Sequence, residues 1–94
     1  MKVVWFKRAI WDLESARHYI AEDNPRAAQQ FVLKIKEMVA LLSTQPGIGR
    51  SGRVPNTKEL VMDHTPYVLP YRVRNNTIEI LRVLHTSRQW PKRF

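Results

Sequence analysis

The sequence predicts an α+β fold, in which an N-terminal strand and an antiparallel helix hairpin pack on one face of a mostly antiparallel four-stranded sheet. Helical periodicity is confined to the first half of the chain, and alternating β-rich runs dominate the second half. The dipeptide Asn75-Asn76 separates two of these runs, and Asn suits a tight hairpin turn because it tolerates positive φ. The expected element order is β-α-α-β-β-β, within one domain that covers residues 1–94.

The N-terminal half reads as a strand followed by two helices. The strand is Lys2–Phe6, and helical spacing begins at about Arg8. Asn24 and Pro25 end the first helix and start the second, because Asn is a strong N-cap and Pro suits the first helical position. Helices joined so closely form an antiparallel hairpin. Their apolar stripes, which we expect to cover the sheet, are Ala9, Leu13, Ala16 and Ile20 in the first helix and Ala28, Phe31, Ile35, Met38 and Leu42 in the second, which ends near Ser43.

The C-terminal half reads as a loop, a short strand and a hairpin. Residues 44–57 hold two prolines and all three glycines of the chain, and Lys58–Asp63 is the short strand. The hairpin strands are Tyr67–Arg74 and Thr77–His85, in a register that pairs Tyr71 with Ile80 and Tyr67 with Leu84. Pro70 has no amide hydrogen for the ladder, so we expect it at a sheet edge or beside a bulge.

Side chains alternate across a strand, so the hairpin has two distinct faces. The nearly apolar face contains Tyr67, Leu69, Tyr71, Val73, Ile78, Ile80, Arg82 and Leu84. The mixed face contains Val68, Pro70, Arg72, Arg74, Thr77, Glu79, Leu81, Val83 and His85. We expect the helices to cover the apolar face, and the mixed face to stay partly open as the working surface.

The chain has a formal net charge of +8, and the positive charge is concentrated in the sheet half and the tail. Residues 1–49 hold seven bases and five acids, whereas residues 50–94 hold nine bases and three acids. Such a field favours nucleic acid or an acidic protein partner, although a basic surface can also serve solubility alone. The chain has no cysteine, which fits a reducing cytoplasm. No apolar run approaches the roughly 20 residues that a membrane helix needs, so no membrane association is expected.

Several motifs for bound cofactors and covalent chemistry are absent or misplaced. Residues 47–52 match G-x-G-x-x-G, but a helix precedes them and a strand follows, which is the reverse of the nucleotide-binding order. His18, His64 and His85 lack metal-ligand spacing. No serine lies in a nucleophile motif. We therefore expect no metal and no small-molecule cofactor.

A set of basic residues could cleave RNA by activating its own 2′-hydroxyl. This reaction needs a base, an acid and cations around the phosphate. His85 could move the protons, while Arg72, Arg82 and Arg88 stabilise charge. The alternative for each is structural. Arg72 faces Glu79 and could form a cross-strand ion pair, Arg82 could lie at the rim of the covered face, and His85 could simply end the strand.

The tail interleaves cations with aromatic rings, at Arg88, Trp90, Lys92, Arg93 and Phe94. Such a segment can bind nucleic acid by charge and stacking, or dock on a protein through Trp and Arg anchors. The alternative is that Trp90 folds back on the sheet and the remaining residues are solvated.

Over nearly its whole length the chain resembles the RelE/ParE superfamily of bacterial type II toxins. The residues that support the resemblance are Asp12-Leu13, Tyr19-Ile20, Gly52-Arg53-Val54-Pro55, Lys58-Glu59-Leu60, Tyr71-Arg72-Val73, Ile80–His85 and Arg88-Gln89-Trp90-Pro91. The resemblance implies a small cytoplasmic toxin that is silenced by an acidic antitoxin, which wraps an extended or helical segment around it. Expected antitoxin contacts are Val68, Leu81, Val83 and Arg74.

The superfamily implies two alternative targets. RelE-like members cut mRNA in the ribosome with a cluster of basic residues, whereas ParE-like members poison DNA gyrase. The resemblance implies that ribonuclease members have a basic residue in the strand near Val68 and a richer Lys/Arg cluster on the neighbouring strand. This chain has no basic residue near Val68 and only Lys58 on the neighbouring strand, and its C-terminal segment looks ParE-like. The favoured expectation is therefore gyrase inhibition, with Arg82, Arg88, Trp90, Lys92 and Arg93 binding the target. The alternatives are a ribosome-dependent endoribonuclease that uses His85, Arg88 and Arg72, and a non-toxic binding protein of the same fold.

Overall fold

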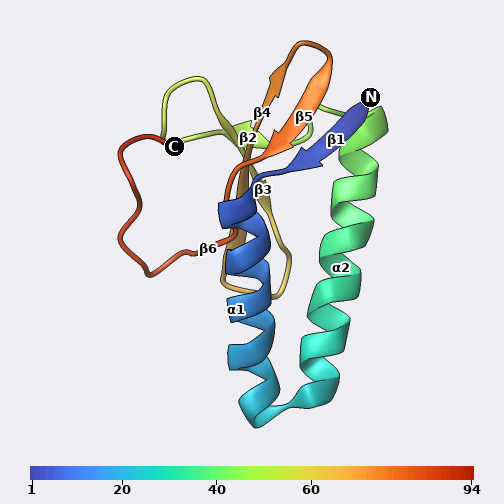
Figure 1. Ribbon diagram of the computed structural model, residues 1–94, viewed down its shortest axis with the longest axis vertical. Helices are drawn as coiled ribbons and strands as arrows, with labels where there is room; N and C mark the ends of the chain where they lie inside the picture. The colour runs from blue at the N-terminus through green and yellow to red at the C-terminus, as the bar shows by residue number, and fades with distance from the viewer.

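The computed structural model describes all 94 residues, and its architecture is α+β as predicted. Two helices form an antiparallel hairpin in front of a sheet (Figure 1). The elements are β1 (Lys2–Trp5), α1 (Lys7–Asp23), α2 (Pro25–Thr44), β2 (Arg50–Ser51), β3 (Lys58–Val61), β4 (Tyr67–Arg74), β5 (Thr77–Ile80) and β6 (Leu84–His85). The short strand β2 lies in the segment predicted as loop, and the predicted strand Thr77–His85 is divided into β5 and β6.

The sheet follows the order β1-β5-β4-β3-β2, and β6 also pairs with β4. Only β1 runs parallel to its neighbour, so the sheet is mostly antiparallel. The long strand β4 lies at the centre and contacts β3 on one side and β5 and β6 on the other. Neither helix is long and apolar enough to cross a membrane.

The helix boundaries follow from local chemistry. The Asn24 side-chain oxygen accepts a hydrogen bond from the Ala27 amide at 3.1 Å, and Pro25 occupies the first turn of α2. These two residues confirm the predicted cap. Helix α1 starts after Phe6 without any side-chain cap, so its position depends on packing and not on a local stop signal.

The core lies between the helix hairpin and one face of the sheet. Its thirteen buried residues are Ala9, Ala16, Phe31, Ile35, Val39, Leu42, Leu60, Met62, Leu69, Tyr71, Ile78, Ile80 and Val83. Tyr71 also holds the loop after α2, because its hydroxyl accepts from the Gly49 amide at 2.9 Å and donates to the Pro46 carbonyl at 2.8 Å. A Cβ on Gly49 would come within 2.6 Å of the Tyr71 ring, so this approach requires glycine.

The hairpin between β4 and β5 turns at Asn75-Asn76 as predicted. Both asparagines have positive φ, at 52° and 58°, which is the conformation that a two-residue hairpin turn needs. The predicted pairs of Tyr71 with Ile80 and Arg72 with Glu79 are confirmed.

A one-residue bulge changes the register beyond Ile80. Tyr67 pairs with His85 and not with Leu84, so the predicted pair was wrong. Three residues separate Ile80 from Leu84, but only two separate Val68 from Tyr71 on β4, and this difference defines the bulge. The Leu81 amide donates to the Pro70 carbonyl at 2.9 Å. A bulge beside Pro70 is thus confirmed, whereas an edge position is wrong because β4 is central and Pro70 is buried.

The bulge redirects the side chains that follow it. Arg82 turns toward α1, where its Nε and Nη2 donate to the Asp12 carboxylate at 2.6 and 3.2 Å. The Val83 amide donates to the same carboxylate at 3.1 Å. His85 lies edge-on to the Tyr67 ring, with 5.2 Å between the ring centroids. The alternative placement of Arg82 at the rim of the covered face is therefore confirmed, and Asp12 is its partner.

The expectation of a partly open mixed face is wrong for its apolar members. Val68 and Leu81 are each 1% exposed and Val83 is 4% exposed. Val83 joins the main core because of the bulge. Val68 and Leu81 are buried outside the core cluster that packs under the helices. The contact between Arg53 and Trp90 brings the tail back to the loop between β2 and β3, and Figure 1 shows the C-terminus returning toward that loop.

We expect Asp12→Asn to lower the free energy of unfolding by about 2–3 kcal/mol, because a largely buried guanidinium loses its counter-charge. Chemical denaturation with urea measures the change. Glu14→Gln is the matched control on the same helix, since its partner Arg17 is solvent-exposed, and it should leave the midpoint unchanged. Equal midpoints for both variants would contradict this role of Asp12.

Burial raises the pKa of the Tyr71 phenol above its usual 10.0. Below pH 10 this phenol is protonated in both the folded and the unfolded chain. Above pH 10 the unfolded chain loses the proton first, so the free energy of unfolding falls as pH rises toward the folded pKa. Tyr71→Phe should cost about 1–2 kcal/mol at neutral pH through its lost hydrogen bonds, and its alkaline decline should be shallower than that of the wild type. Parallel alkaline profiles would refute the assignment.

Candidate functional site

A groove of about 870 Å³ lies at the end of the molecule where α1 meets α2. It is bounded by the helix hairpin, by the turn between β3 and β4, and by the segment that follows β6. Its ionisable lining residues are Tyr19, Asp23, Lys34, Asp63, His64, Tyr67, His85 and Arg88. The structure therefore brings His85 and Arg88, two residues of the predicted catalytic set, into one groove.

His85 is held in a defined orientation within this groove. Its Nδ1 accepts a hydrogen bond from the Ser87 amide at 3.1 Å, and the Ser87 hydroxyl lies 2.7 Å from the same nitrogen. Because a backbone amide can only donate, Nδ1 is unprotonated, and the proton of the neutral ring is on Nε2. The nitrogen that remains free is thus a hydrogen-bond donor, which suits binding of an oxygen more than abstraction of a proton.

Tyr67 forms the wall of the groove beside His85. Its ring packs at 5.0 Å from that of Phe31 on α2 and at 5.2 Å from the His85 ring. Burial raises the pKa of the Tyr67 phenol, while the nearby Arg88 opposes the shift. The phenol is therefore neutral at physiological pH, and it can donate a hydrogen bond but cannot act as a base there.

Arg72, the third residue of the predicted catalytic set, lies elsewhere. It is five residues along β4 from Tyr67, which corresponds to about 16 Å of extended strand. Its Nε donates to the Glu79 carboxylate at 2.5 Å, and Arg74 lies 3.6 Å from the same oxygen. The cross-strand ion pair is thus confirmed, and Arg72 does not share a site with His85.

The opposite sheet face contains a buried acid that gathers two arginines. Glu59 is 2% exposed, and its carboxylate lies 2.9 Å from Arg50 Nη2 and 3.5 Å from Arg53 Nε. The Arg53 amide also donates to it at 2.9 Å. The Arg53 guanidinium stacks 3.7 Å from the centre of the Trp90 ring. Trp90 therefore folds back on the body of the protein, as one of the two alternatives for the tail expected.

The remaining predicted contact residues divide by exposure. Arg88, Lys92 and Arg93 are exposed cations, and so is Arg74. Arg82 is mostly covered and paired with Asp12, so its charge is neutralised. Val68 and Leu81 are each 1% exposed, and Val83 lies in the main core, so none of the three offers an open apolar surface to a partner. No group of three or more His, Asp or Glu side chains is placed to hold a metal ion.

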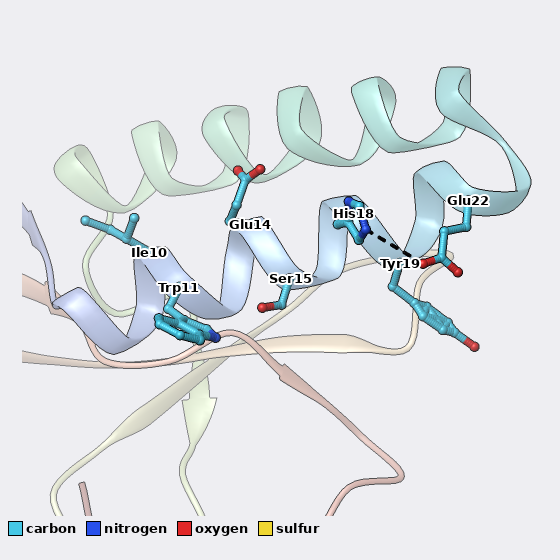
Figure 2. A pocket seen from close by; sticks show the side chains of 7 residues that line it. All are labelled: Ile10, Trp11, Glu14, Ser15, His18, Tyr19 and Glu22. Atoms are coloured by element: carbon cyan, nitrogen blue, oxygen red, sulfur yellow. Dashed lines mark ion pairs between the residues drawn. The ribbon is translucent and has the colours of Figure 1, made fainter.

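Sequence reasoning missed two parts of the surface. Lys34 and Tyr67 join the groove only through tertiary packing, and no local pattern indicated this. The outer face of α1 could have been found, because Trp11 and Tyr19 lie off the predicted apolar stripe of that helix. They are 75% and 63% exposed and border a shallow hollow lined by α1 residues alone (Figure 2).

Comparisons with known proteins agree with this architecture. Residues 3–90 match the family model described as the ParE toxin of the type II toxin–antitoxin system parDE. The protein Y4kP of Sinorhizobium fredii, whose name describes it as a candidate toxin, is 40% identical over 97% of this chain and 94% of its own length. Toxin RelE2 of Caulobacter vibrioides is 37% identical over 93% of this chain and 97% of its own length.

A solved structure of the chromosomal ParDE system from P. aeruginosa matches with a TM-score of 0.79 and 32% identity. The match covers 90% of this chain and 95% of the other. Sequence and fold therefore agree over the same, nearly complete, stretch. The chain belongs to the ParE family within the RelE/ParE superfamily, and it is the toxin of a type II toxin–antitoxin system, whose partner is an antitoxin.

Proposed function

We propose that this toxin inhibits DNA gyrase in the cytoplasm and that a cognate acidic antitoxin neutralises it. The observation that supports this most is the state of its cations. Arg88, Lys92 and Arg93 are exposed and have no acidic partner, whereas Arg72 and Arg82 are paired with carboxylates. Three free cations thus lie close together within residues 88–93, whereas the other exposed cations without an ion pair are spread over β1 and the two helices. The tail can therefore present a local cluster of positive charge to a large macromolecular surface.

The anchoring of Trp90 supports a binding role for the tail. Because the Trp90 ring is stacked on Arg53, the tail is fixed at its middle and its cations project from a defined place. A segment that is ordered before binding loses less conformational entropy on association than a free one. Positive charge additionally speeds the encounter with an acidic surface.

The geometry gives less support to nuclease chemistry. Cleavage through the 2′-hydroxyl needs a base beside cations that stabilise the phosphate. The Nδ1 atom of His85 already accepts a hydrogen bond from the Ser87 amide. Arg72 is paired with Glu79 and lies about 16 Å along β4 from Tyr67, which is the neighbour of His85. Inhibition of gyrase by binding does not require His85 and Arg72 to lie in one site.

Membership of the family implies that an antitoxin binds this protein. The exposed cations suggest where acidic residues of the antitoxin would make contact. Arg74 is exposed at the hairpin end of β4, and Glu79 neutralises it only partly at 3.6 Å. Val68, Leu81 and Val83 are buried in the free toxin, so none of them is available for a first contact with the antitoxin. We therefore propose Arg74 as an initial contact.

We expect the double variant Lys92→Glu and Arg93→Glu to raise the toxin concentration that inhibits gyrase supercoiling at least about tenfold, because tail charge is reversed. Lys36→Glu, an exposed charge reversal on α2, is the matched control and should inhibit like the wild type. Wild-type toxin that leaves supercoiling unchanged at micromolar concentration would exclude gyrase as the target.

A ribosome-dependent endoribonuclease is the second candidate, because His85, Arg88 and Tyr67 line one groove and one relative is named a RelE toxin. Primer extension on mRNA from induced cells tests it. The gyrase proposal expects no new cleavage sites, and expects growth arrest to persist in His85→Ala. Cleavage that is lost in His85→Ala and retained in Thr86→Ala, its exposed neighbour, would instead establish the nuclease.

A further inference from the structure

The outer face of α1 presents a stripe of five exposed residues that nothing in the molecule covers. The stripe consists of Arg8, Trp11, Ser15, Tyr19 and Glu22. At 3.6 residues per turn these positions fall within an arc of about 80°. Trp11, Ser15 and Tyr19 point from the same side of the helix (Figure 2). Successive members of the stripe are three, four, four and three residues apart, which keeps all five on one side of the helix.

The stripe is symmetric about Ser15, with an aromatic residue and a charged residue at equal distances on each side and with charges of opposite sign at its two ends. Trp11 and Tyr19 each lie four residues from Ser15, while Arg8 and Glu22 each lie seven residues away. An antiparallel copy of α1, related by a two-fold axis through Ser15, would therefore place Trp11 against the partner's Tyr19. The same axis would place Arg8 against the partner's Glu22. Ser15 would meet its own copy, and its small side chain permits close approach of the two helices.

The charges of α1 disfavour the isolated helix. Its first turn holds Lys7 and Arg8 with no acid, and its last turn holds Glu22 and Asp23 with no base. This order opposes the helix macrodipole, which favours acids at the N-terminus and bases at the C-terminus. Arg8 has no ion pair in the monomer, and Glu22 meets only His18, at 3.8 Å. An antiparallel copy would neutralise these charges at both ends.

We propose that the free toxin forms a homodimer in which two α1 helices pair antiparallel about Ser15. Two Trp11–Tyr19 contacts form the centre of the interface, and two Arg8–Glu22 pairs flank it. Aromatic side chains are favoured anchors in protein interfaces. A single helix pair is smaller than a standard interface, so the dimer belongs to the weak class and forms at high toxin concentration.

This interface goes beyond the proposed function, because it involves neither the tail nor the cations assigned to target binding. It has a geometric link to the groove, since Tyr19 lines both surfaces. A second copy on α1 would therefore cover one edge of the groove that contains His85 and Arg88.

Sedimentation equilibrium of the purified toxin across concentrations tests the proposal. We expect Trp11→Ala to abolish the dimer. Arg8→Glu and Glu22→Arg should each weaken it at least about tenfold, because either change turns both attractive Arg8–Glu22 pairs of the dimer into pairs of like charge. The combined Arg8→Glu and Glu22→Arg variant should restore association, since the pairs re-form with reversed sign. Leu33→Ser, which removes an apolar residue of α2 that is 59% exposed, is the control and should dimerise normally.

Thermal melting separates loss of the interface from loss of the fold. Both single charge variants improve the match to the helix macrodipole, so the melting temperature of dilute protein should not fall. A wild-type toxin that stays monomeric at about 0.5 mM would overturn the proposal, because weak interfaces associate in that range. A dimer that survives Trp11→Ala, or one that the charge exchange fails to restore, would overturn it equally.

Discussion

The missing amide hydrogen of Pro70 is the constraint on which the arrangement of the site depends. Pro70 lies in the central strand β4, where a regular ladder would need that donor, and the returning chain accommodates it with one extra residue. This bulge exchanges the faces of Val83 and His85, which come to lie on the helix side of the sheet. Arg82 reaches Asp12 on α1, and His85 reaches the groove beside Tyr67. A regular hairpin would have left His85 on the opposite side of the sheet.

The buried carboxylate of Glu59 organises the other side of the sheet. It holds Arg50 and Arg53, and Arg53 in turn receives the Trp90 ring. These contacts tie the tail to the loop between β2 and β3. The arginines on this side of the sheet are paired with acids, whereas Arg88, Lys92 and Arg93 of the tail are exposed and unpaired.

Helix α1 illustrates how packing can override local preference. It lacks a side-chain cap and has the wrong charge order for its macrodipole, yet it spans Lys7–Asp23 because Ala9 and Ala16 pack closely on the core and Asp12 binds Arg82. Since contacts on the inner face of α1 hold the helix in place, the fold does not depend on the residues of its outer face. That freedom allows aromatic and charged residues there to serve association.

The sequence by itself determined the elements and the family. Hydrophobic period, the Asn24-Pro25 cap and the Asn75-Asn76 turn are local features, and they predicted both helices and the central hairpin because they depend on residues close in the chain. Only the tertiary structure decided which face each residue after Ile80 occupies. Pro70 indicated an edge position or a bulge, but not that one extra residue would lie on the returning strand and reverse the alternation there. The groove that joins Lys34, Tyr67 and His85, and the burial of Val68 and Leu81, depend on segments distant in sequence, and local patterns contain no information about such contacts.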